Sequence, residues 1–98
     1  MRTHILKIRE PYFSDVLNKI KTFEIRKDDR VYEVGDKLIL KLYPYIKTDT
    51  KEEIYASIIY KLDKIPQYGL AEGYCILGIK LLGYNIDNKV TLFTDCKK

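Results

Sequence analysis

Three side chains that can bind a charged or polar ligand, Lys21, Glu24 and Arg26, lie close together in the segment "KTFEIRK". The alternation of this segment predicts a strand in which Glu24 and Arg26 share one face, about 7 Å apart. We expect Phe23 and Ile25 to anchor the strand to the core from behind. Lysine and arginine donate to a phosphate or a base edge, and glutamate accepts from an exocyclic amine. The segment therefore predicts a compact polar cleft; the alternative is a surface ion-pair ladder, worth about 0–1 kcal/mol.

Positive charge is concentrated around this segment. Residues 1–27 hold seven Lys and Arg against three Asp and Glu, whereas the rest of the chain holds eleven of each, for a formal net charge of +4. Lys7 and Arg9 share the outward face of the first predicted strand, and Lys27 and Arg30 follow the motif. We predict that all four belong to an anion-binding surface. Because the total charge is small, we expect a site for one or a few nucleotides rather than an extended nucleic-acid surface.

Tyrosine is the main aromatic residue, with nine Tyr, three Phe and no Trp. A tyrosine ring can stack on an unpaired base while its hydroxyl stays hydrated. Tyr74, Tyr68 and Tyr12 are the candidates nearest the predicted cleft. We predict that Tyr74 binds nucleic acid together with the basic residues.

The elements that must position these residues form an α+β fold. Six strands are predicted, at residues 3–9, 22–27, 37–43, 53–62, 74–84 and 89–94. An amphipathic helix of about ten residues is predicted to follow Pro11, because apolar residues recur there at helical spacing. We predict a small mixed β-barrel of about six strands with one main helix near the N-terminus. An open α+β sheet with the helix on one face is the alternative.

Several details of the strands are also predicted. The apolar run at 74–84 is typical of a central strand buried on both faces, and Gly78 within it indicates a bulge or a close backbone approach. Ile54, Ala56, Ile58, Tyr60 and Leu62 are expected on one face of the strand at 53–62. Residues 47–52 are expected to form a loop, and 66–73 an irregular connection with room for one helical turn.

The composition indicates one ordered domain, residues 1–98. Hydrophobic residues make up 46% of the chain and charged residues 33%, and no apolar run approaches the ~20 residues of a membrane span. The charged start "MRTHILKIRE" does not resemble an export signal, and Cys75 and Cys96 read as reduced thiols. One histidine, His4, leaves no zinc-binding spacing, and we expect it to be hydrogen-bonded in the core. We expect a cytoplasmic monomer without metal, cofactor or membrane partner.

The segment "KTFEIRKDDRVYEVGD" resembles the core motif of ASCH domains, a branch of the PUA-like superfamily, whose pattern is G-x-K-x-x-E-x-R. Lys21, Glu24 and Arg26 match, and Lys19 stands where the glycine is expected. A positive φ at Lys19 would cost roughly 1 kcal/mol relative to glycine. Within this branch the chain is most similar to the DUF3850 group, sharing "THILKI", "KTFEIRKDDR", "VGD" and "EGYCILG", from Thr3 to about Lys80.

The resemblance implies a PUA-like β-barrel with a helix beside a cleft, which binds RNA or a nucleotide. Some ASCH relatives are instead amidohydrolases that act on N4-acetylcytidine, using the lysine of this motif, a threonine and a distant glutamate. Here Glu24 stands in place of that threonine, and Glu72 is the acidic residue near the late strand that would complete the set; the alternative is that Glu72 is a solvated loop residue before Gly73. The alternative function is therefore a hydrolase of a modified nucleoside, with Lys21 and Glu24 as catalytic groups.

Overall fold

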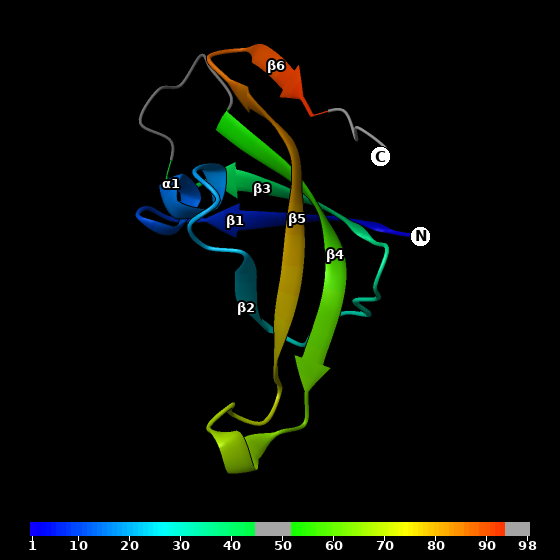
Figure 1. The fold of residues 1–98 in the computed structure, drawn as a ribbon. Coiled ribbons are helices and arrows are strands. Elements are labelled where there is room, and N and C mark those ends of the chain that lie inside the picture. The colour runs from blue at the N-terminus through cyan, green and yellow to red at the C-terminus, as the bar shows by residue number, and fades with distance from the viewer. Residues whose placement is uncertain (45–51, 94–98) are drawn as a thin grey trace.

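Six strands form one curled sheet in the computed structural model, which describes residues 1–44 and 52–93 (Figure 1). The strands lie in the order β1-β3-β4-β5-β2, and β6 pairs with the end of β5. Their bounds are Thr3–Ile8 for β1, Phe23–Lys27 for β2, Lys37–Leu42 for β3, Glu52–Asp63 for β4, Tyr74–Ile86 for β5 and Lys89–Leu92 for β6. β1 and β3 run parallel, and the other pairs are antiparallel.

All six strands were expected from the sequence, but within the described residues they form a half-barrel rather than a closed one. β1 and β2 stand at the two ends of the strand order, and among residues 1–44 and 52–93 no backbone ladder pairs them. The space between these two edge strands, which we call the seam, is where the candidate site lies. Most of the loop expected at 47–52 falls outside the described residues, and the turn expected in 66–73 is a 3-10 helix, Pro66–Tyr68.

The predicted main helix is not confirmed, because α1, Tyr12–Leu17, has only six residues. It ends in a Schellman motif, in which the N–H of Ile20 donates to Asp15 and the N–H of Lys19 to Val16. Lys19 occupies the left-handed position of this motif with φ 62°, the place where glycine is usual. The turn therefore begins about three residues earlier than the apolar spacing indicated and leaves Ile20 exposed.

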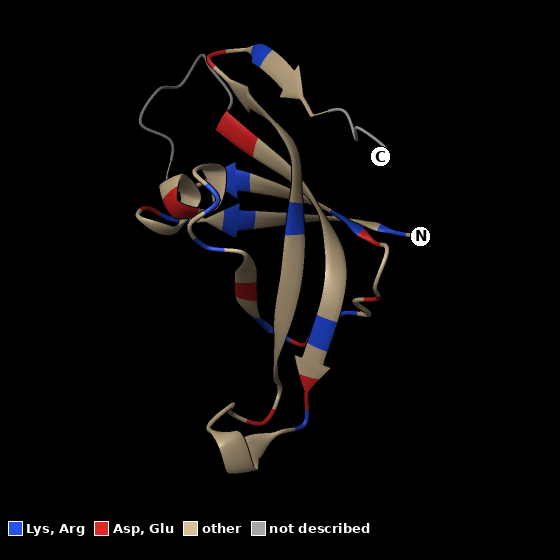
Figure 2. Cartoon of the chain, viewed as in Figure 1, with Lys and Arg blue, Asp and Glu red and all other residues tan. Residues whose placement is uncertain are grey.

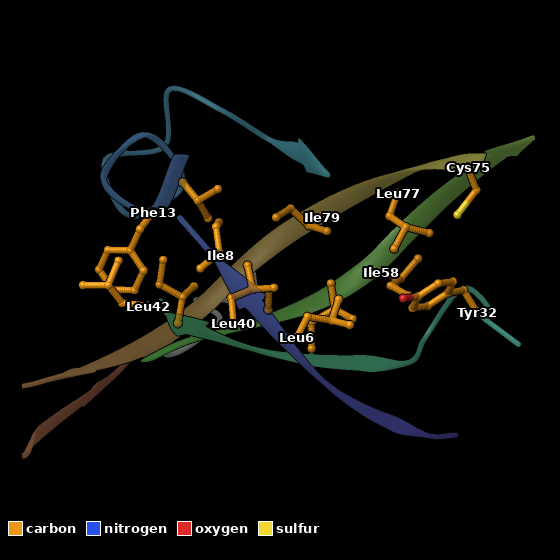
Figure 3. Close-up of a cluster of buried hydrophobic side chains, with 14 residues drawn as sticks. Leu6, Ile8, Phe13, Tyr32, Leu40, Leu42, Ile58, Cys75, Leu77 and Ile79 are labelled. Carbon is orange, nitrogen blue, oxygen red and sulfur yellow. The ribbon is translucent and has the colours of Figure 1, made fainter. Parts of the chain in front are cut away.

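The core lies between α1 and the inner face of the sheet (Figure 3). β1 and β3 alternate as expected, each with every second side chain buried. The largest fully buried apolar side chains are Leu38, Leu40, Ile54, Ile58, Leu77 and Val16. Cys75 is buried beside them, and burial raises the pKa of its thiol. Cys96 falls outside the described residues.

His4 lies in this core with a hydrogen-bonded partner, as expected. Its Nε2 is 2.8 Å from Oδ2 of Asp36, and its ring centroid is 4.7 Å from that of Tyr32. The Asp36 carboxylate also accepts the backbone N–H groups of Arg2 and Glu33. The His4 bond and these N–H groups lower the pKa of Asp36 to about 2. Asp36 therefore fastens the start of β1 to the turn that leads into β3.

Two predictions about the long hairpin of β4 and β5 are wrong, and the reasons differ. The register of the two strands shifts between Ile58 and Tyr60, opposite Gly78, so a bulge reverses the faces of β4 beyond that point. Tyr60 is accordingly exposed rather than buried with Ile58. β5 is likewise buried on its inner face only, because no element of the described chain covers its outer face near Tyr74 and Ile76. The bulge indicated at Gly78 lies in the partner strand, because the extra residue, Ile59, belongs to β4 and stands opposite Gly78.

No helix in the described part of the chain is long and apolar enough to cross a membrane.

Candidate functional site

A buried carboxylate forms the centre of the site. Glu24 leaves only 4% of its surface exposed, on the inner face of β2. Its Oε2 accepts from Nζ of Lys21, and its Oε1 accepts from Nε and Nη2 of Arg26 at 3.2 and 2.9 Å. A carboxylate has about four lone-pair sites, so these three bonds leave about one for a ligand. Lys21, Glu24 and Arg26 thus form one cluster, as the sequence predicted.

β2 turns toward the core the face that was expected to point to solvent. Phe23 and Ile25 are 41% and 55% exposed, and they point away from the core rather than into it. The two basic side chains offset much of the cost of burying Glu24, and this makes the inward carboxylate tolerable. Alternation alone identified the two faces of the strand but could not tell which one is buried.

Arg26 links the two edge strands across the seam. Besides its bonds to Glu24, Nη2 of Arg26 donates to the backbone carbonyl of Lys7 in β1 at 2.7 Å. These bonds use three of its five N–H groups and leave the two on Nη1 for a ligand. A single side chain therefore makes a connection that backbone pairing makes elsewhere in the sheet.

Lys21 lies just before β2 and bonds the other carboxylate oxygen of Glu24 from the one that Arg26 bonds. Its Nζ donates to the carbonyl of Phe23 at 2.6 Å as well as to Glu24. The same ammonium lies 4.9 Å from the ring centroid of Phe23 and 5.6 Å from that of Tyr12 in α1. Two aromatic rings and a carboxylate therefore fix the position of this cation.

The cluster lines a cavity of about 480 Å³ that opens along the seam, which we call the seam pocket. Its lining residues lie in β1, α1 and β2 or directly beside β1, β2 and β3. They are Lys7, Ile8, Arg9, Tyr12, Lys21, Phe23, Glu24, Ile25, Arg26 and Tyr43. Four of them are basic and one is acidic. Figure 2 shows Lys and Arg at the ends of β1 and β3 beside α1. The cluster is therefore part of a concave site and not a flat ladder of ion pairs.

Lys7 and Arg9, both predicted binding residues, lie at the rim of the seam pocket around a residue that the sequence did not single out. Nζ of Lys7 is 4.5 Å and the guanidinium carbon of Arg9 5.4 Å from the ring centroid of Tyr43. β1 and β3 are parallel, so their C-terminal ends meet, and the N–H of Tyr43 donates to Ile8 at 2.9 Å. Only the parallel pairing of β1 with β3, which alternation does not reveal, would have identified Tyr43.

The remaining predicted residues lie away from the seam pocket. Tyr74 and Glu72 line a separate hollow beside the β4–β5 connection, and Tyr68 is on the 3-10 helix of that connection. Glu72 therefore does not complete a catalytic set with Lys21. Lys27 is exposed at the end of β2, and Arg30 pairs with Asp29 at 3.6 Å; neither lines the seam pocket. Of the three tyrosines proposed, the structure brings only Tyr12 into the site.

No group of three His, Cys, Asp or Glu side chains that could hold a metal ion occurs among residues 1–44 and 52–93. The seam pocket itself has a single acidic side chain whose oxygens already accept three hydrogen bonds. Its chemistry is that of a site for an anionic or hydrogen-bonding organic ligand.

The fold and the site define a small, mainly β protein with a basic pocket at the seam of a half-barrel. A family model described as a domain of unknown function, DUF3850, matches residues 3–79. The chain therefore belongs to the DUF3850 family, and the matched residues include the whole Lys21–Glu24–Arg26 cluster. No curated protein matches the chain.

Proposed function

We propose that the seam pocket binds RNA or a nucleotide. The observation that carries the proposal is a cavity of nucleotide size, about 480 Å³, in which four basic side chains and three aromatic rings surround one carboxylate. The basic groups match phosphate, and the rings match the faces of a base. The K-x-x-E-x-R spacing at the entry to β2, in a curled sheet, also supports our proposal of an ASCH-type, PUA-like fold.

The residues divide into three roles in this proposal. Lys7, Arg9 and the free Nη1 of Arg26 face the phosphate, because they carry donors that the cluster does not use. Tyr12 and Tyr43, 51% and 39% exposed, offer rings for a base to stack on. Glu24 holds the Lys21 and Arg26 cations in place and has about one acceptor site left for a base amine.

A titration of fluorescently labelled, short single-stranded RNAs at low and moderate salt tests the proposal. We expect Lys21→Ala/Arg26→Ala to weaken binding at least tenfold, and added salt to weaken wild-type binding. Lys64→Ala/Lys89→Ala, which removes the same charge outside the pocket, is the matched control. Because the first variant also strips Glu24 of its partners, Lys7→Ala/Arg9→Ala at the rim serves as a second test. Wild-type affinity in both pocket variants would overturn the proposal.

A hydrolase is the second candidate, and it is favoured by one observation, a lysine beside a buried carboxylate inside a cavity. Against it, the Lys21 ammonium is paired with the Glu24 carboxylate, and a protonated amine has no lone pair with which to act as a base or nucleophile. Hydrolysis of N4-acetylcytidine would consume water and release cytidine and acetate, which chromatography separates. Turnover that disappears in Lys21→Ala would establish this activity; absence of turnover in the wild type would remove it.

A further inference from the structure

The outer face of the sheet beside the seam pocket carries an apolar surface that extends beyond the pocket. The register of β4, β5 and β2 shows which side chains share this face, which is the face opposite Leu77 and Cys75. We call the following residues the outer face: Tyr60, Leu62, Tyr74, Ile76, Gly78, Phe23, Ile25 and Lys27. Three are aromatic, three are aliphatic, one is basic and none is acidic.

Four of these apolar side chains are open to solvent, and Leu62 and Ile76 are half-buried. Tyr60 is 61% exposed, Ile25 55%, Tyr74 42% and Phe23 41%. Apolar side chains gathered to this extent on one sheet face indicate an interaction surface. The bulge at Ile58/Tyr60 is what brings Tyr60 to this side, so the local backbone irregularity has a direct consequence for the surface.

A glycine separates two of the aromatic residues in one cross-strand row. Gly78 pairs with Tyr60 on one side and with Phe23 on the other, so about 10 Å, two strand spacings, separate the two aromatic positions. A Cβ at Gly78 would lie 3.1 Å from Cβ of Tyr60, so the row has no room for a larger residue there without movement. The row thus has an aromatic residue at each end, and the glycine between them has no side chain.

The outer face is continuous with the seam pocket, because Phe23 and Ile25 belong to both. The only charged side chain among its residues is Lys27, which is positive and exposed. A surface that has aromatic rings, a cation and no acid among its own residues is complementary to a polyanion with exposed bases. An acidic partner without planar rings would match the lysine but not the three aromatic residues.

We propose that the outer face is a stacking platform for single-stranded RNA that continues from the seam pocket, with Phe23, Tyr60 and Tyr74 as the base-stacking residues. This inference rests on the proposed function of the pocket. Its size suits two or three nucleotides, since β2 and its neighbours span about 10 Å across and about 13 Å along the strands. The platform would make affinity depend on the length of the RNA, which a pocket alone would not.

RNA length separates the two sites in an experiment. Fluorescence anisotropy would compare unstructured RNAs of about three and about nine nucleotides, lengths that bracket the combined sites. We expect the wild type to bind the longer RNA at least tenfold more tightly. Tyr60→Ala/Tyr74→Ala, which leaves the pocket intact, should lose at least fivefold affinity for the longer RNA and none for the shorter. Tyr68→Ala, an 80% exposed tyrosine off the outer face, is the matched control.

The possible results distinguish failure of the seam pocket from failure of the outer face. A wild type that binds neither RNA overturns the proposed function and this inference with it. Binding of both RNAs that Tyr60→Ala/Tyr74→Ala leaves unchanged, with circular dichroism showing a folded variant, retains the pocket and overturns the platform. Concentration-dependent dimerisation in ultracentrifugation that the same variant abolishes would show that a second copy covers the face, and would also overturn it.

Discussion

The guanidinium of Arg26 joins the two edge strands of the half-barrel by donating to the backbone carbonyl of Lys7 at 2.7 Å. The same Nη2 donates to Glu24 at 2.9 Å, so one side chain connects the buried carboxylate to the rim of the pocket. The motif residue that is best suited to meet phosphate therefore also holds the seam together. Binding and local structure are coupled through it.

Arg26→Lys should weaken the seam although it conserves the charge. A lysine has one nitrogen and no planar fork, so it cannot bond Glu24 through two nitrogens and also reach Lys7. We expect the free energy of unfolding to fall by about 1 kcal/mol, the usual value of a hydrogen bond. Urea unfolding followed by circular dichroism measures this. Arg30→Lys, at an exposed pair with Asp29, is the control, and an equal effect of the two substitutions would contradict the role of Arg26.

Lys19→Gly should stabilise the protein. Lys19 has φ 62°, a conformation that costs an L-residue about 1 kcal/mol more than glycine. The gain is partly offset by loss of the contact between its Nζ and the Phe93 ring, 4.9 Å away. We expect an increase of up to about 1 kcal/mol in the free energy of unfolding, measured by urea titration. Lys19→Ala keeps the strained φ and serves as control; a Gly variant no more stable than the Ala variant would refute the expectation.

Asp36 should contribute stability that disappears in acid. Its pKa in the folded protein is about 2, below the value near 3.9 of an unfolded aspartate. A lowered pKa means that the folded state favours the carboxylate, so the contribution is full above about pH 4 and is lost as the pH falls towards 2. The stability gap between wild type and Asp36→Asn should therefore narrow from pH 5 to pH 2. Glu33→Gln, at an exposed residue, is the control, and a constant gap would contradict the role of Asp36.

Gly83→Ala should detach β6. A Cβ at Gly83 would lie 2.3 Å from the carbonyl oxygen of Thr91 in β6, so the paired backbone must move. We expect a loss of about 1–3 kcal/mol, as for other overpacked sites, concentrated in the β5–β6 pairing. Hydrogen exchange should show faster exchange of the β6 amides, with the β1–β3 amides unchanged. Protection of β6 equal to that in the wild type would show that the backbone accommodates the methyl group.

Alternation located β1–β4, because period-two burial follows directly from the pleat, as in β1 with His4, Leu6 and Ile8 buried, whereas an apolar run located β5. It failed where geometry breaks the period. The bulge before Tyr60 exchanges the faces of β4, and the Schellman turn at Lys19 shortens the helix. Neither is encoded by hydrophobic spacing, although Gly78 did mark the bulge.

The chemistry of the site was predictable in part. Spacing brought Glu24 and Arg26 together, and the charge distribution indicated Lys7 and Arg9. The inward direction of Glu24 was not predictable, because it depends on Lys21 and Arg26 supplying enough compensation to bury a carboxylate. Tyr43 was missed for a different reason: its place in the site depends on the pairing of two strands far apart in sequence.

Amide chemical-shift mapping tests the central claim most directly. A ¹⁵N-labelled protein is titrated with a nucleoside monophosphate and then with a short single-stranded RNA. The proposal predicts that the largest shifts occur at residues 7–9, 21–26 and 43, on both sides of the seam, and that they weaken in Lys7→Ala/Arg9→Ala. Shifts confined to the β4–β5 connection or to β6, or no shifts with either ligand, would contradict the assignment of the seam pocket as a nucleotide-binding site.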